Sequence, residues 1–205
     1  MWALVEDNTI TKIINNPKAL VIGDTRHSRK IFELWSEAEL NNIGIYSVVF
    51  DNSNKQDEEY YANTNQTFAF ADGAVTASYG SATAKALADT LFTAQDEIDG
   101  KGTEGEVAAR GLKFQKKSIV KRQAAGILQD TDWYITRKAD AGTAIPSAVT
   151  THRAAVRTKS GEMETAIDNA ADVDALAALY QYVNTGTEEN PVMERPLGEW
   201  PVLEV

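Results

Sequence analysis

The chain has 205 residues, a formal net charge of −10, and 43% hydrophobic and 24% charged residues. Its length predicts one or two domains that can bury a core, and its acidity disfavours non-specific binding to nucleic acid, which is also a polyanion. The lack of cysteine excludes disulfides, thiolate catalysis and cysteine-ligated metal sites.

The first residues, MWALVEDNT, are acidic where a secretory signal peptide would be basic. No stretch approaches the roughly 20 apolar residues that a membrane-spanning helix needs. We therefore expect a protein made in the cytoplasm that does not enter a membrane.

The first 80 residues are typical of a small antiparallel β unit. Apolar runs at 2–5, 9–14 and 18–22 are separated by polar turn residues. Ser36 and Glu39 have the spacing of a capping box and predict a short helix that ends near Asn41. A β-forming run follows at 43–50. Residues 67–79 then alternate around Asp72-Gly73, which predicts a hairpin.

After Gly80 the composition favours helices. The alanine-rich segment 81–98 lacks glycine and proline and is expected to be helical, as is 106–128, where Gly111 and Gly126 are weak points. Pro146 is suited to the first turn of a further helix, whose continuity Gly161 threatens. Val149, Val156 and Met163 recur there at heptad spacing.

Asp172 is placed to cap a last helix, with a linker at 184–191 and an extended, proline-containing end. The sequence thus predicts an α+β fold with a β-rich domain at 1–80, a helical domain at 81–186 and an extended tail at 187–205.

Motifs that would carry chemistry are weak. Gly100, Gly102 and Gly105 match G-x-G-x-x-G, but an expected helix precedes them and the neighbouring acids would repel phosphate, so an interhelical loop is the better interpretation. His27 and His152 lack an evident set of metal ligands and are assigned to packing. The acidic segment 51–59 departs from a calcium loop at Lys55 and Gln56. No catalytic residue, cofactor or metal site is predicted.

A basic cluster stands out in the acidic chain. Lys113, Lys117 and Lys121 recur every four residues and share one helical face, with Lys116 and Arg122 close by. This face either docks on an acidic partner or pairs with the chain's own acids, such as Asp99, Asp130 or Asp132. The second interpretation is favoured.

Large aromatic residues are the other candidate contact groups. Trp133, Tyr134 and Trp200 are of the size that occupies a core or the centre of an interface. Trp200 lies in the extended end, which either packs on its own domain or binds a partner. The sequence leaves both alternatives open.

Several short pieces of the chain form a recurring set: W-S-x-x-E-L-x-x-I-G-I-Y at 35–46, T-D-W-Y at 131–134, Ile145-Pro146, R-A-A-V-R at 153–157 and Trp200-Pro201. Together they resemble small accessory proteins of tailed bacteriophages, the tail fibre assembly or tail assembly chaperone-like proteins. The 81–98 segment lies between the similar parts and makes this chain longer than many such proteins.

The resemblance implies a non-enzymatic protein that assists assembly of the tail or tail-fibre apparatus, or forms part of it. Its expected partners are tail or tail-fibre proteins, with no nucleic acid and no membrane, in the host cytoplasm during assembly or in the virion tail. One alternative is a self-assembling virion subunit, in which the heptad of Val149 joins a trimeric bundle. Another is a hydrolase of host-surface polymer that uses carboxylates such as Asp130 and Asp132.

Overall fold

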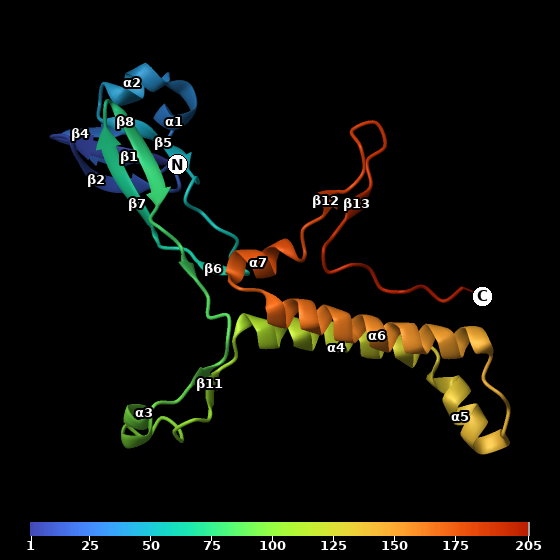
Figure 1. Ribbon diagram of the computed structural model, residues 1–205. Coiled ribbons are helices and arrows are strands. Elements are labelled where there is room, and N and C mark those ends of the chain that lie inside the picture. Colours follow the sequence, from blue (N-terminus) through green and yellow to red (C-terminus); the bar gives the residue numbers. More distant parts are fainter. Residues whose placement is uncertain (205) are drawn as a thin grey trace. The chain divides into compact units, whose positions relative to one another are not determined.

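Alternating apolar side chains in the first part of the chain build a five-stranded sheet in the order β2-β1-β5-β8-β7 (Figure 1). Its strands are β1 (Trp2–Glu6), β2 (Thr9–Ile14), β5 (Ile45–Asp51), β7 (Gln66–Ala71) and β8 (Ala74–Tyr79). The computed structural model describes residues 1–204. They divide into two units, with the boundary between Thr83 and Ala84.

The sheet is mixed and not purely antiparallel as expected. The β1–β2, β1–β5 and β7–β8 pairs are antiparallel, whereas β5 and β8 run parallel. The connection between β5 and β8 contains β6 (Tyr61–Ala62) and β7, which is long enough to return the chain to the same end of the sheet.

Both faces of this sheet contribute to a core. One face packs under the hairpin of β3 (Leu20–Ile22) and β4 (Thr25–His27) and under helices α1 (Ile31–Leu34) and α2 (Glu37–Asn41). The buried residues on this side are Leu4, Ile14, Leu20, Ile31, Leu40 and Ile45. The opposite face buries Ala3, Val5, Val48, Val75 and Ala77.

Two local predictions in this unit are confirmed. The Ser36 hydroxyl accepts the Glu39 backbone N–H while a Glu39 carboxylate oxygen accepts the Ser36 backbone N–H, which is the expected capping box at the start of α2. Asp72 and Gly73 form the turn of the β7–β8 hairpin with φ of 50° and 73°. Both signals are contained within a few residues, so distant contacts do not alter them.

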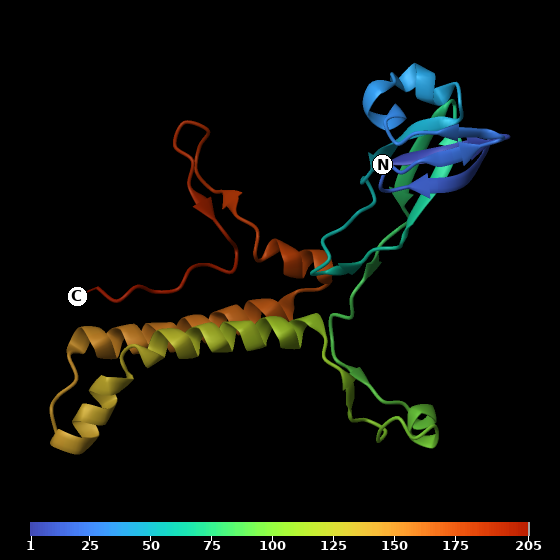
Figure 2. The same cartoon turned by 180° about the vertical axis from the view of Figure 1, so that it is seen from behind.

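The second unit is built on two long helices, α4 (Leu112–Gln129) and α6 (Ser147–Asn169), which lie side by side in both views (Figures 1 and 2). Val149, Val156 and Met163 are all buried in α6, opposite Val120 and Ala124 of α4. The heptad residues therefore pack within this chain. Neither Gly126 nor Gly161 interrupts its helix, and the Asp172 carboxylate caps α7 (Val173–Ala178) as expected.

The expected helix at 81–98 is wrong over most of its length. The structure has short strands β9 (Thr83–Ala84) and β10 (Thr90–Leu91) there, and only α3 (Ala94–Ile98) is helical. The carbonyl oxygens of Ala86 and Leu87 accept the first backbone N–H groups of α4, at 2.9 and 3.0 Å. Alanine's helix propensity is a weak preference, and capping of a longer helix overrides it here.

Two other boundaries differ from the expectation. The predicted helix at 106–128 begins only at Leu112, because β11 (Val107–Ala109) pairs with β10. The predicted linker at 184–191 is instead the loop of a hairpin formed by β12 (Val183–Asn184) and β13 (Met193–Glu194). No helix forms between Pro196 and Glu204, in agreement with the predicted extended tail.

Gly111 provides a test of the cap on α4. A Cβ atom at this position would collide with the backbone carbonyl of Ala88, which is fixed by the neighbouring hydrogen bonds, whereas nothing lies within 4 Å of a Cβ at Gly126 in the same helix. Gly111→Ala should therefore lower the free energy of unfolding by about 1–3 kcal/mol. The matched change Gly126→Ala should raise it by about 0.5–1 kcal/mol in urea denaturation. Equal effects of the two changes would contradict this cap.

Candidate docking surface

Arg153 of α6 holds the junction between α4 and the next helix, α5 (Asp132–Ala141). Its side chain is 9% exposed. Its guanidinium donates to the carbonyl oxygen of Leu128 at 2.7 Å and to the Thr131 hydroxyl at 2.6 Å, and pairs with the Asp132 carboxylate at 2.9 Å. These contacts satisfy a carbonyl at the end of α4 and fix the start of α5.

The aromatic pair that follows is turned outward. Trp133 is 51% exposed, and its ring lies 3.8 Å from that of Tyr134, centroid to centroid. The Arg137 guanidinium lies 4.6 Å from the Trp133 centroid and 5.3 Å from that of Tyr134. Exposed Ile135 and Lys138 complete what we call the α5 surface: Trp133, Tyr134, Ile135, Arg137 and Lys138.

Arg137 differs from other stacked arginines in the chain. Arg110 lies over Phe114 and pairs with Asp89, while Arg195 lies over Tyr182 and pairs with Glu199. Arg137 has no ion pair within residues 1–204, and its Nε is buried without an acceptor. Because Nε is buried, a carboxylate from outside would pair with the rest of the guanidinium, which makes no ion pair within residues 1–204, and the α5 surface is thus suited to receive a carboxylate.

The expected basic face is used inside the chain. The Lys113 ammonium donates to the Asp168 backbone carbonyl at 2.8 Å, Lys117 pairs with the Asp168 carboxylate at 2.7 Å, and Lys121 pairs with Glu164 at 3.2 Å. These acids lie on α6, so the lysines join α4 to α6. The lysines thus pair within the chain, with Asp168 and Glu164 as partners and not Asp99, Asp130 or Asp132.

The C-terminal segment packs on its own unit. The Trp200 indole N–H donates to the Gln123 side chain at 3.2 Å, the Leu197 backbone N–H donates to Leu179, and Leu197 is 4% exposed. Trp200 is therefore an anchor of the tail on α4, and we do not include it in the α5 surface. Beyond it Val202 is 82% exposed.

The remaining candidate residues have structural roles. His152 is buried on α6 and lines a depression of about 380 Å³ with Thr151, Ala155 and Pro201. Asp132 is engaged by Arg153, and Asp130 ends α4 as its C-cap. Gly100 and Gly105 belong to the loop between α3 and β11 and have positive φ.

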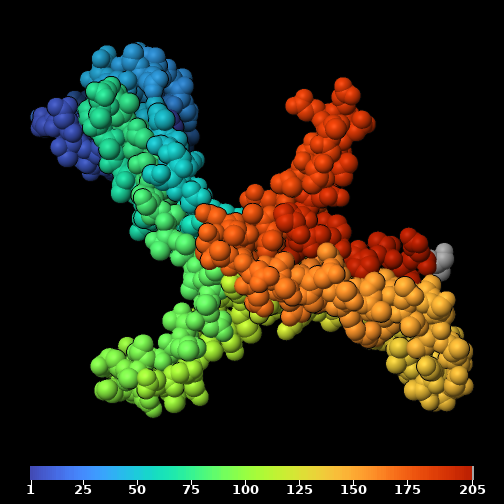
Figure 3. All heavy atoms as spheres, viewed as in Figure 1, coloured from blue at the N-terminus to red at the C-terminus, as the bar shows by residue number. Residues whose placement is uncertain are grey.

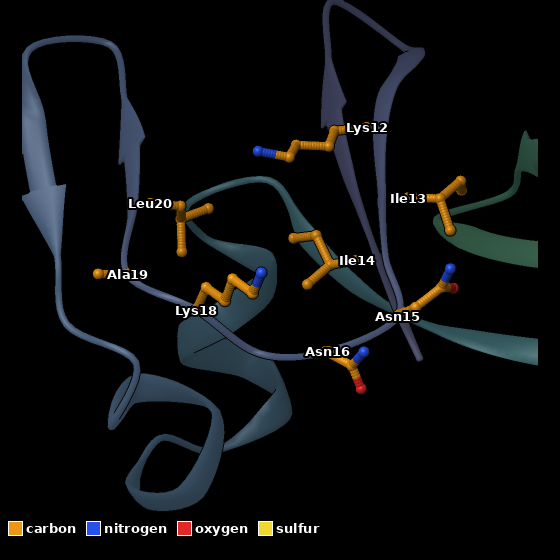
Figure 4. Close-up of a pocket in the computed structure, with 8 residues that line it drawn as sticks. All are labelled: Lys12, Ile13, Ile14, Asn15, Asn16, Lys18, Ala19 and Leu20. Carbon is orange, nitrogen blue, oxygen red and sulfur yellow. The ribbon is translucent and has the colours of Figure 1, made fainter.

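A second hollow lies in the first unit, between the end of β2 and the start of β3 (Figure 4). Its volume is about 240 Å³, with Lys12, Lys18 and two asparagine amides around Ile14 and Leu20. This lining contains no carboxylate, imidazole or hydroxyl group. It therefore offers no acid–base pair of the usual kind.

The β12–β13 hairpin is a second exposed element of the same unit. Tyr182, Val183, Val192 and Met193 are 47–56% exposed, and the strands share only two residue pairs. The hairpin stands clear of the α4–α6 pair in the space-filling view (Figure 3). Its base is tied to the tail, because the Tyr182 hydroxyl donates to Glu199 at 2.6 Å and Arg195 pairs with the same carboxylate at 2.9 Å.

Two of these features were missed in the sequence. Arg137 follows Trp133 by four residues and Tyr134 by three, a spacing that places its side chain over both rings on a helix. The hairpin has the pattern of two short apolar pairs, Tyr182-Val183 and Val192-Met193, around a polar loop with Gly186. Strands of two residues are too short for periodicity to reveal them.

Arg153 allows a direct test of the α4–α5 junction. Arg153→Met keeps an apolar stem but removes the donor to the Thr131 hydroxyl and the ion pair with Asp132, so unfolding free energy should fall by about 1–3 kcal/mol in urea denaturation. Arg157→Met is the control, since Arg157 is exposed and bonds only to a carbonyl of its own helix. That change should stay within about 0.5 kcal/mol of the parent. Equal losses of unfolding free energy in the two variants would show that Arg153 does not hold the α4–α5 junction.

The stability of the Tyr182–Glu199 contact at the base of the hairpin should fall in both acid and alkaline solution. The Tyr182 hydrogen bond, with a smaller effect of Arg195, holds the pKa of Glu199 below its ordinary 4.5, and the same bond raises the pKa of Tyr182 above 10.0. The contact needs ionised Glu199 and protonated Tyr182. Its stabilisation is present between about pH 4.5 and 10 and is lost as pH passes below the folded Glu199 pKa or above that of Tyr182.

Methyl NMR signals of Val183 and Val192 should report this loss in acid. Glu199→Gln should remove the acid transition, whereas Glu189→Gln, at an exposed acid of the hairpin loop, should leave it in place. An unchanged transition in the Glu199 variant would show that another group controls it.

No family model, curated protein or solved structure matches this chain. Among residues 1–204 no helix is both long and apolar enough to cross a bilayer, and no group of three or more histidine or acidic side chains is placed to hold a metal ion. The side chains themselves are thus the basis for assigning a role, and the most specific arrangement they form is an exposed aromatic stack with an unpaired arginine.

Proposed function

We propose that this protein is a non-enzymatic component or assembly factor of a bacteriophage tail that acts through protein–protein contacts. The starting point is the resemblance of residues 35–46, 131–134 and 153–157 to tail fibre assembly proteins. The observation that carries the contact itself is the α5 surface, where a half-exposed Trp133 stacks beside an arginine without a carboxylate.

Two of the similar segments contact each other, which supports the proposal. Thr131 and Asp132 of the T-D-W-Y piece are held by Arg153, the first residue of the R-A-A-V-R piece. Trp133, which is exposed, and Tyr134, which is half-buried, are then the members of that piece that Arg153 does not engage. The half of the motif that Arg153 holds therefore positions the aromatic half, which favours a contact role for the segment.

The α5 surface defines what its partner must offer. An apolar side chain should cover the Trp133 face, and a carboxylate should approach Arg137 from its open side. Tryptophan and arginine are the residues that most often dominate binding energy, because burying them together removes a large apolar area and forms a charge-assisted hydrogen bond. Tail or tail-fibre subunits are the partners we propose, in the host cytoplasm during assembly or in the virion tail.

Trp133→Ala should test this surface with little effect on folding. The side chain is half exposed, so unfolding free energy should change by less than about 1 kcal/mol, while loss of a central tryptophan should weaken partner binding by roughly 2 kcal/mol or more. The measurement is recovery of tail and tail-fibre proteins with the tagged chain from phage-infected cells, together with mass spectrometry of purified virions.

Phe114→Ala is the matched control. Phe114 is 43% exposed and also lies beside an arginine, but that arginine already pairs with Asp89. The control should recover tail proteins as the parent does. Equal recovery by the Trp133 variant would exclude the α5 surface as the contact, and recovery of no tail protein by the parent, with none of the chain in virions, would reject the function.

A further inference from the structure

The chain exposes more surface than folding alone explains. Its accessible area is 13407 Å². A compact protein of its mass has about 9,400 Å², and two separate compact domains of about 9 and 13 kDa would together have about 11,300 Å². The remaining excess of roughly 2,000 Å² is more than twice the area of about 800 Å² that one partner contributes to a standard interface.

Part of this excess belongs to the β12–β13 hairpin. A two-stranded ribbon with two residue pairs is marginal in water on its own, and this one exposes Val183, Val192 and Met193. Its loop carries Glu188 and Glu189, neither of which makes an ion pair within residues 1–204, and β13 ends at Glu194. The segment 182–194 has no basic residue. It is an apolar, acidic arm.

The α5 surface of the same chain has the complementary chemistry. It presents two aromatic rings, Ile135 and the unpaired cations Arg137 and Lys138. A methionine such as Met193 packs favourably against aromatic rings, and a carboxylate beside it would supply the acceptor that Arg137 lacks. Within residues 1–204 the other ring-stacked arginines, Arg110 and Arg195, each already pair with an acid.

We propose that the β12–β13 hairpin of one copy docks on the α5 surface of a second copy. This inference rests on the proposed role of the α5 surface as a contact site and names its occupant. Val192 and Met193 cover Trp133, and the acids of the hairpin loop approach Arg137 and Lys138. In Figures 1 and 2 the hairpin and α5 leave the α4–α6 pair at different places, so each copy presents both elements.

Such a contact joins two different patches and is therefore head-to-tail. It generates a ring if the rotation between neighbours closes, and an open chain if it does not. It also replaces the trimeric bundle considered from the heptad pattern, because Val149, Val156 and Met163 are already buried between α4 and α6.

Charge exchange between the two patches tests the contact. In sedimentation velocity on the purified chain over a concentration series, the parent should self-associate. Arg137→Glu and the double change Glu188→Lys with Glu189→Lys should each weaken association roughly tenfold or more, because each brings like charges together. An equimolar mixture of these two variants should associate again as alternating copies. In one contact the carboxylate introduced at position 137 of the first variant meets the lysines of the second variant's hairpin, and in the other contact the native Arg137 meets the native acidic hairpin.

Arg26→Glu is the control for the change of net charge. Arg26 is exposed on β4 in the first unit, and this variant should associate as the parent does. A parent that stays monomeric at about 100 µM, well above the range of specific complexes, would overturn the proposal. Single variants that still associate, or a mixture that does not, would also overturn it.

The outcome is separable from that of the proposed function. Loss of tail-protein recovery in the Trp133 variant together with a monomeric parent would leave the tail role standing and reject the second copy as occupant. Restored association in the variant mixture, with no tail protein recovered by the parent, would support the self-contact and reject the tail role.

Discussion

The buried guanidinium of Arg153 is the contact on which the second unit depends. Removing a cation from water costs several kcal/mol, so a buried guanidinium needs acceptors, which the two Nη groups of Arg153 have and its Nε lacks. The Leu128 carbonyl, the Thr131 hydroxyl and the Asp132 carboxylate supply acceptors from the end of α4 and the start of α5. These acceptors come together in only one arrangement of the three helices, which fixes where α5 leaves the pair and keeps Trp133 outside it.

The α4–α6 pair shows why an acidic chain keeps a lysine-rich helix. The apolar stripes of two helices bury only a narrow seam, and Lys117 and Lys121 close one side of it by pairing with Asp168 and Glu164. Exposed pairs of this kind contribute at most about 1 kcal/mol each, so they select the antiparallel partner and register more than they stabilise it. With these lysines paired inside the chain, Arg137 is distinctive because it stacks on aromatic rings and makes no ion pair within residues 1–204.

The features that could be predicted from the sequence are those set by a few neighbouring residues. The Ser36–Glu39 capping box, the Asp72-Gly73 turn and the Asp172 cap depend on hydrogen bonds within four residues, and all three formed as expected. The segment 81–98 did not, because its backbone caps α4 across a distance of more than 20 residues. At the site, the size of Trp133 and Tyr134 makes them candidates from the sequence alone. Arg137 is significant because it lies over both rings and has no acid beside it, and this can be seen only in the folded chain.

Self-association of a chain with ten excess negative charges needs a physical account. The net charge repels a second copy at long range, but at physiological ionic strength screening limits this repulsion to about 8 Å. Within that distance the sign of the local patches decides the outcome, and the acidic hairpin faces Arg137 and Lys138 rather than the average surface. Salt should then act in two directions, weakening the local pairs while it relieves the overall repulsion. An interface held mainly by Trp133, Val192 and Met193 would depend only weakly on ionic strength, because its largest contribution is the burial of apolar area.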